Sequence, residues 1–214
     1  MHITYGAAGI PVPGAQPRLA SWTEYIGTRA GGQRQWRLAS PRLGWTGMRD
    51  TGFWATQTSR LATSGRPTPR GLTVFDQPDG MRGRPPAFGN AAAGLVSTAR
   101  DLLAVARMLL AHGSPTRPAR AARAMTTGQL TARQRARGGF GPDFFASQSW
   151  SYCQLVQDSG AFGWDGGLGT TWQVEPRYDL TVIILTQRMF DSPDRPAAHA
   201  AIVAAAYDAL AGRL

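Results

Sequence analysis

The residues best placed to do chemistry lie in a glycine-rich stretch near the C-terminus, from Phe162 to Trp172. Four glycines, at positions 163, 166, 167 and 169, stand there among aromatic side chains. Glycine has no Cβ, so it leaves the backbone N–H groups of a strand open to another group. The stretch therefore predicts a strand edge that something approaches closely, just before a hairpin.

Other side chains capable of catalysis or metal binding are scattered. Three histidines lack the short spacings of metal ligands, which predicts surface or capping roles and no cofactor: His2, His112 and His199. Three aspartates have no partner on the same element and are expected to be solvated: Asp143, Asp158 and Asp165. Asp165 carries more weight because it lies in the glycine-rich stretch. The single Cys153 excludes an intramolecular disulfide and is expected to pack as a small hydrophobe.

Tryptophans at positions 150, 164 and 172 admit two interpretations. They line a pocket, or they pack a core as aromatic strand residues commonly do. Both alternatives stay open on the sequence.

Around these residues the pattern predicts antiparallel strands. Period-two runs of β-branched and aromatic residues favour strands near 150–157, 167–174 and 180–187, with a turn at 175–179. A C-terminal helix is expected from Pro196, with Ile202, Val203, Ala206, Tyr207 and Leu210 on its apolar face.

The preceding part of the chain is less regular. Thr98 and Asp101 predict the start of a helix that ends near His112, with Leu102, Val105, Ala106, Leu109 and Leu110 as its apolar face. A second helical pattern covers 117–137. Proline, glycine and arginine predict a long loop over 56–90, and residues 1–42 have no sustained period.

Composition narrows the class of protein. The 214 residues with 43% hydrophobic content suit one domain. All 23 basic residues are arginine, and 19 of them fall in residues 1–137 against 5 acidic residues, a net +14. The arginines form no stripe on one helix face and lack interleaved aromatics, so specific nucleic-acid binding is not expected.

We find no membrane-length apolar run or signal peptide and expect a cytoplasmic chain, although an export signal lost with the N-terminus would change that location.

Three segments, in order, resemble the serine β-lactamase and penicillin-binding-protein family, especially its class C-like, esterase-type members. Met48–Phe53 resembles Gly-Met-x-Asp-Thr-Gly-Phe, and Ala92–Leu102 resembles Gly-Gly-Leu-x-Ser-Thr-Ala-x-Asp-Leu. Gly163–Gly167 stands where that family has Lys-Thr-Gly or His-x-Gly. The similarity covers 43–214 as the C-terminal part of such a domain and leaves 1–42 poorly matched.

This resemblance implies an α/β (α+β) fold, an antiparallel sheet with flanking helices. It implies hydrolysis of a small-molecule ester or amide through a serine acyl-enzyme, with Trp164, Asp165, Gly166 and Gly167 as substrate-binding residues. Trp164 in place of Lys or His indicates an ester. Backbone N–H groups of this strand would serve an oxyanion hole.

Two family motifs are missing from the sequence. The nucleophile motif Ser-x-x-Lys is absent, and arginine cannot replace its lysine because a guanidinium stays protonated. Ser97-Thr98-Ala99-Arg100 imitates that motif but lies in a helix-capping context. No Tyr-x-Asn occurs either. We therefore expect a truncated hydrolase with no catalytic residue of its own, whose missing motifs are encoded just upstream or in an alternative reading frame over about the first 40 codons.

The alternative is a non-catalytic binding module. It would use the glycine-rich groove, or the arginine-rich half of the chain, to hold an acidic partner.

Overall fold

The computed structural model describes residues 2–3, 48–87, 94–112, 119–138, 143–152 and 154–212, and every structural statement below concerns these residues. They divide into two compact units. The first comprises Met1–Leu102, Gly166–Thr170 and Leu185–Pro193, and the second comprises Leu103–Asp165, Thr171–Ile184 and Asp194–Leu214. Each unit is described by itself.

In the first unit, two of the family-like segments pair with each other. Strand β4 (Leu95–Val96) pairs antiparallel with β1 (His2–Ile3), and Val96 also bridges Gly52. The Gly52 N–H donates to the Val96 carbonyl at 3.0 Å, and the Val96 N–H returns a bond of 2.7 Å. The same unit contains two short 3-10 turns, η1 (Thr58–Arg60) and η2 (Met81–Gly83).

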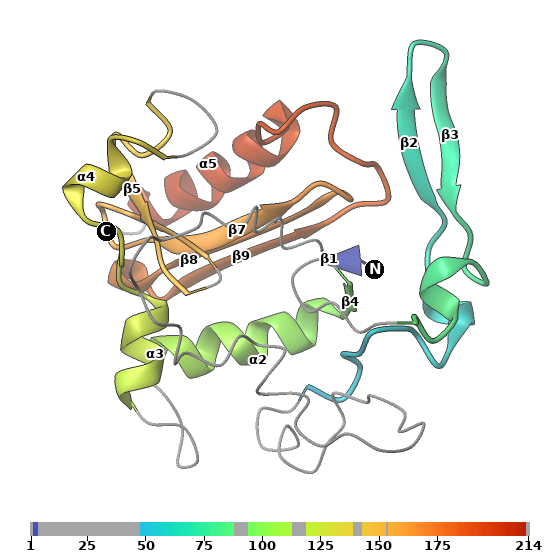
Figure 1. Ribbon diagram of the computed structural model, residues 1–214, viewed down its shortest axis with the longest axis horizontal. Helices are drawn as coiled ribbons and strands as arrows, with labels where there is room; N and C mark the ends of the chain where they lie inside the picture. Colours follow the sequence, from blue (N-terminus) through green and yellow to red (C-terminus); the bar gives the residue numbers. More distant parts are fainter. Residues whose placement is uncertain are drawn as a thin grey trace. The chain divides into compact units, whose positions relative to one another are not determined.

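A β-hairpin occupies part of the region expected to be a loop. Strands β2 (Ser64–Thr68) and β3 (Gly71–Asp76) pair antiparallel and form the two-stranded ribbon of Figure 1. Gly71 has φ of 112°, and the Thr68 hydroxyl donates to its carbonyl at 2.8 Å, which closes the turn. The loop expectation over 56–90 was wrong here because proline and glycine at the turn concealed the alternating residues of β3.

A five-stranded sheet forms the centre of the second unit, in the order β5-β6-β7-β8-β9. Its strands are β5 (Gln148–Trp150), β6 (Leu155–Gln157), β7 (Phe162–Gly166), β8 (Thr170–Glu175) and β9 (Leu180–Leu185). Pairs β5–β6 and β6–β7 are antiparallel. The connections β7–β8 and β8–β9 span three and four residues, which only antiparallel neighbours allow.

The sheet confirms the expected antiparallel order but corrects two strand boundaries. The run expected at 150–157 is two strands, because the Ser151 N–H donates to the Gln154 carbonyl and closes a turn between them. The glycine-rich stretch splits into β7 and a turn at 167–169. β7 is not an edge strand: β6 pairs with its first two residues and β8 lies on its other side.

Helix α2 (Ala99–Leu110) is confirmed as the sequence predicts it. The Asp101 N–H donates to the Thr98 hydroxyl at 3.3 Å, which caps the N-terminus. Leu102, Ala106 and Leu109 are buried.

The helical pattern over 117–137 breaks into α3 (Ala119–Met125) and α4 (Ala132–Arg135). The Thr126 hydroxyl bonds back to the Ala122 carbonyl at 3.2 Å where α3 ends. Thr131 and Gln134 then form a capping box that starts α4.

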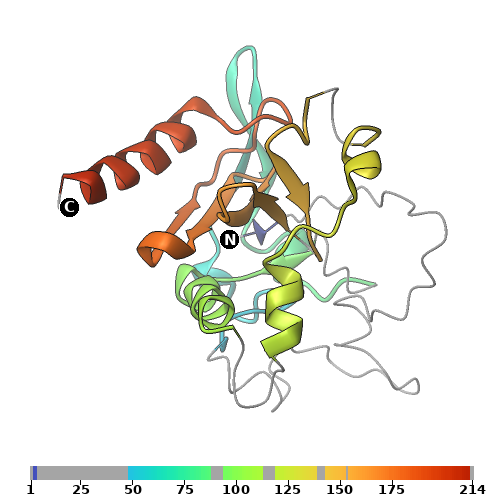
Figure 2. The same ribbon diagram turned by 90° about the vertical axis from the view of Figure 1, so that its left-hand side faces the viewer.

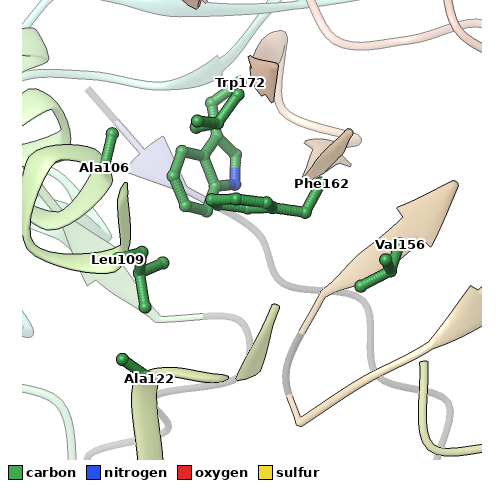
Figure 3. Close-up of a cluster of buried hydrophobic side chains, with 7 residues drawn as sticks. Ala106, Leu109, Ala122, Val156, Phe162 and Trp172 are labelled. Carbon is green, nitrogen blue, oxygen red and sulfur yellow. The ribbon is translucent and has the colours of Figure 1, made fainter. Parts of the chain in front are cut away.

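The two faces of the sheet pack against different helices (Figures 1 and 2). On one face β6, β7 and β8 pack against α2 and α3 through a buried cluster shown in Figure 3: Ala106, Leu109, Ala122, Val156, Phe162, Trp172 and Val174. On the other face Val182 and Ile184 pack against Val203 of α5 (Ala197–Ala211). Ile202 is 50% exposed and does not join the apolar face predicted for this helix.

Candidate functional site

Strand β7 approaches β8 so closely that position 163 accepts only glycine. Gly163 has φ of 154°, a conformation that L side chains rarely adopt. A Cβ at this position would overlap the Trp172 carbonyl oxygen and lie 2.9 Å from the Gln173 Cα. The glycine-rich sequence predicts that another group approaches the backbone closely. At Gly163 that group is the neighbouring strand β8.

Gly166 and Gly167 begin a tight turn with many backbone hydrogen bonds. The Gly169 N–H donates to the Gly166 carbonyl at 2.9 Å, and the Phe190 N–H donates to the Gly167 carbonyl at 2.9 Å. Thr186 binds the Gly169 carbonyl through its N–H at 2.8 Å and its hydroxyl at 2.9 Å. A Cβ at Gly167 would meet nothing within 4 Å, so open space lies on its Cβ side.

The Trp164 side chain lies on the aromatic face of β7. Its ring meets Trp150 edge to face, with centroids 4.5 Å apart and planes at 86°. Trp164 packs against the buried cluster and is only partly exposed, whereas Trp172 is 4% exposed within that cluster. The core interpretation is confirmed for Trp172, and Trp164 stands at the margin of the core.

The Asp165 side chain is held in an ion pair. Arg195 donates through Nε to the two carboxylate oxygens at 3.0 and 3.2 Å, and through Nη1 to the Gln173 Oε1 at 3.0 Å. Asp165 and Arg195 are 21% and 26% exposed. The expectation of a solvated loop carboxylate was wrong for Asp165, because a strand and a distant arginine fix it.

Further polar groups extend this network along β8. Gln173 donates through Nε2 to the Tyr207 hydroxyl at 3.0 Å. Arg177 binds both Glu175 carboxylate oxygens at 3.0 Å and holds the pKa of that carboxyl below its usual range. Burial raises the pKa of the Tyr207 hydroxyl. Charged and amide groups thus join β8 to α5 beside its apolar contacts.

His199 is buried, contrary to the surface or capping role expected for it. It is 5% exposed, and its Nδ1 lies 2.8 Å from the Thr171 Oγ1. Burial lowers the pKa of His199, and Arg195 adds to this effect while Asp165 opposes it. No local sequence pattern indicates this contact, because the two residues are 28 positions apart.

We predict that His199 makes stability depend on pH. The pKa of His199 in the folded chain lies below the usual value of 6.5, so the unfolded chain binds a proton more readily as the pH falls. The contribution of the neutral imidazole to the free energy of unfolding is therefore complete above pH 6.5 and is lost as the pH falls through the pKa of the folded chain. The free energy of unfolding in urea should fall between about pH 7.5 and pH 5 more in the wild type than in His199→Gln. The exposed His112 supplies a control, His112→Gln, which should follow the wild type. Equal pH dependence in wild type and His199→Gln would contradict the prediction.

In the first unit, two family-like segments meet at a buried polar cluster. Thr51 Oγ1 donates to Asp101 Oδ2 at 2.6 Å, and the Asp50 N–H donates to the same oxygen at 2.8 Å. Because the Thr51 hydroxyl proton is already used in the bond to Asp101, the Ser97 hydroxyl is the donor in its 2.8 Å bond with Thr51 Oγ1. Ser97 and Asp101 are 3% and 1% exposed, so the sequence that imitates Ser-x-x-Lys holds a buried structural serine.

Replacing Thr51 with valine is expected to lower the free energy of unfolding by about 1–3 kcal/mol. The change keeps the shape but leaves buried Asp101 without one hydrogen-bond donor. Thr56 is exposed, and Thr56→Val should change the free energy by less than about 0.5 kcal/mol. Urea denaturation of the three proteins measures both effects, and equal values for the two variants would overturn this account of the cluster.

Within the described ranges, no group of three His, Cys, Asp or Glu is arranged to hold a metal. In the same part of the chain no helix has the length and apolar content needed to cross a bilayer. Cys153 and the segment 1–42, apart from residues 2–3, lie outside the described residues. Arg195 and His199 were missed as neighbours of the glycine-rich strand because no local pattern links α5 to it.

The profile of the family described as Beta-lactamase matches residues 21–207. The chain is also similar to Protein Rv1367c of Mycobacterium tuberculosis, with 33% identity over 185 residues that cover 76% of this chain and 44% of that protein. The chain thus spans less than half the length of this relative.

Solved structures of similar fold have low sequence identity. EstCE1, a hydrolase with promiscuous acyltransferase activity, gives a TM-score of 0.57 at 20% identity, covering 70% of this chain and 44% of that one. A mutant of simvastatin synthase from Aspergillus terreus gives 0.59 at 16%, covering 75% and 45%. The octameric penicillin-binding protein homologue from Pyrococcus abyssi gives 0.52 at 18%, covering 76% and 35%. These similarities show a shared fold, and the profile match over most of the sequence shows that the chain belongs to the beta-lactamase family.

Proposed function

We propose that this chain supplies the substrate-binding strand of a serine hydrolase that acts on esters, and that its own residues form no acyl-enzyme. The observation that carries the proposal is Trp164, which stands on β7 where the family resemblance places Lys or His. An indole carries no charge, and because the Nε1 of Trp164 is buried, only the apolar part of its ring is available to a substrate. It cannot pair with a substrate carboxylate, so a neutral ester suits this position.

The backbone of β7 is the surface that we propose for the substrate. β6 begins at Leu155, which pairs with Gly163, so the last three residues of β7 extend past the start of β6. Of these three residues, the N–H groups that point away from β8 are the donors proposed for the substrate carbonyl. Such donors stabilise the developing oxyanion, and loss of one costs about 3–4 kcal/mol in related chemistry.

Asp165 is proposed as a positioning residue for this strand. Its ion pair with Arg195, which also binds Gln173, joins β7 to β8 and to the start of α5. The Gly166–Gly169 turn is fixed by backbone bonds at its other end. Trp164 would contact the acyl or alcohol part of the ester, while Gly166 and Gly167 allow close approach.

The absence of acylation follows from side-chain chemistry. The 214-residue sequence holds no lysine and therefore no Ser-x-x-Lys. Ser97 is buried and donates its proton to Thr51. The truncation expected from the sequence remains a prediction, which the reading frames upstream of Met1 would test.

Saturation-transfer NMR tests the proposed substrate class. Ethyl butyrate should show contact with the wild-type chain, and benzylpenicillin, which carries a carboxylate, should show little. Trp164→Lys places a cation on the strand and should shift the preference toward benzylpenicillin. The matched control Trp54→Lys adds the same charge elsewhere and should leave the preference unchanged. No ester contact, or no shift in a folded Trp164→Lys variant, would refute the proposal.

A further inference from the structure

A cavity of about 200 Å³ lies in the first unit, at the base of the β2–β3 hairpin. Most of its wall is apolar and comes from Leu61, Phe75, Leu168 and Leu185. Six polar residues also line it: Ser64, Asp76, Gln77, Arg82, Thr186 and Gln187. The combination of an apolar wall with a few convergent polar groups is typical of a small-molecule site.

Two of these polar groups are buried without a hydrogen-bond partner among the described residues. They are the Ser64 Oγ and the Arg82 Nε. A buried donor that lacks an acceptor costs roughly the desolvation of that group, so native chains rarely leave one unpaired. Two such atoms lie beside one small cavity, where water or a ligand would have to supply the acceptors.

Among the described residues, the Asp76 carboxylate accepts no hydrogen bond from the side chain of Arg82. Its carboxylate accepts the Met81 N–H at 2.8 Å and the Arg82 N–H at 3.2 Å, which caps the turn η2. The Arg82 guanidinium makes no ion pair within the described residues. Burial lowers the pKa of the guanidinium and the nearby Asp76 carboxylate opposes that shift, yet an arginine stays protonated at any neutral pH.

We propose that this cavity binds a monocarboxylate with a short apolar tail. The planar guanidinium matches a carboxylate through Nε and a second N–H, and the Ser64 hydroxyl donates a further bond. The apolar wall receives the tail. A cavity of about 200 Å³ has room for a tail of a few carbon atoms.

This site is separate from the proposed ester-binding strand. None of the residues 163–167 lines the cavity, although Leu168 follows Gly167 directly. Carboxylate binding does not require acylation, a nucleophile or Trp164. Failure of one proposal would therefore leave the other standing.

Proton–nitrogen correlation spectra of the arginine Nε–H groups provide the test on the full chain. The Arg82 signal is identified by its loss in Arg82→Gln. Titration with sodium butyrate should shift that signal with a dissociation constant on the order of 1 mM, and butyramide should bind at least about tenfold more weakly. Calorimetry of butyrate and butyramide on the wild-type chain makes the same comparison without any variant, so it holds even if Arg82→Gln fails to fold.

Variants separate the site from general attraction of anions to a basic chain. Calorimetry should show at least a tenfold loss of butyrate affinity in Arg82→Gln and a smaller loss in Ser64→Ala. Arg84 is exposed and donates to the Asp79 carbonyl, so Arg84→Gln removes a neighbouring charge outside the cavity and should leave affinity unchanged. Equal loss in Arg82→Gln and Arg84→Gln, equal affinity for butyrate and butyramide, or no binding would overturn the proposal.

Discussion

Gly163→Ala is expected to lower the free energy of unfolding by about 4 kcal/mol or to abolish the cooperative transition. Two effects add at this position. The φ of 154° is strained for alanine, at about 1–3 kcal/mol. The new Cβ would overlap the Trp172 carbonyl oxygen, and overpacking of this kind costs about 1–3 kcal/mol more because β7 and β8 must separate.

Gly167→Ala is the matched control four residues along the chain. A Cβ there meets nothing within 4 Å, so the change should alter the free energy of unfolding by less than about 1 kcal/mol. Urea denaturation followed by circular dichroism measures both variants. Similar midpoints for Gly163→Ala and the wild type would contradict the described approach of β7 to β8.

The second large effect is an absence of turnover. The chain is expected to hydrolyse neither a chromogenic cephalosporin nor short p-nitrophenyl esters above the rate in buffer. Activation of a serine needs a neighbouring base that can lose its proton; the sequence contains no lysine, and the arginine of Ser97-Thr98-Ala99-Arg100 stays protonated. Nucleophilic attack by Ser97 is also opposed by its burial and its bond to Thr51.

Ser97→Ala serves as the control for this expectation. Any residual hydrolysis should be the same in the wild type and in Ser97→Ala, since Ser97 is proposed to have a structural role. A turnover that Ser97→Ala abolishes, with the variant still folded, would show that the site has been misread.

Local patterns were sufficient to predict several elements. α2 follows from a capping threonine and apolar residues at helical spacing, and the structure confirms both. β8 and β9 follow from β-branched runs on either side of a turn that holds Pro176. These elements were predictable because their signals are carried by neighbouring residues.

Other features depend on contacts between distant residues, which the sequence does not display. The Thr171–His199 contact joins β8 to α5, and Asp165 is fixed by Arg195 thirty positions later. The hairpin β2–β3 was missed because the proline and glycine that shape its turn also signal a loop. In the glycine-rich stretch, the structure shows a close approach at Gly163, and the group that comes close is β8; the substrate-binding role of Gly166 and Gly167 stays a prediction.

Intact-mass spectrometry after incubation with a fluorescent penicillin, and separately with a p-nitrophenyl ester, tests the central claim most directly. The account predicts that the folded chain keeps the mass of its 214 residues, with no acyl adduct at any time point. A single stoichiometric adduct on one serine, blocked when that serine is changed to alanine, would contradict it.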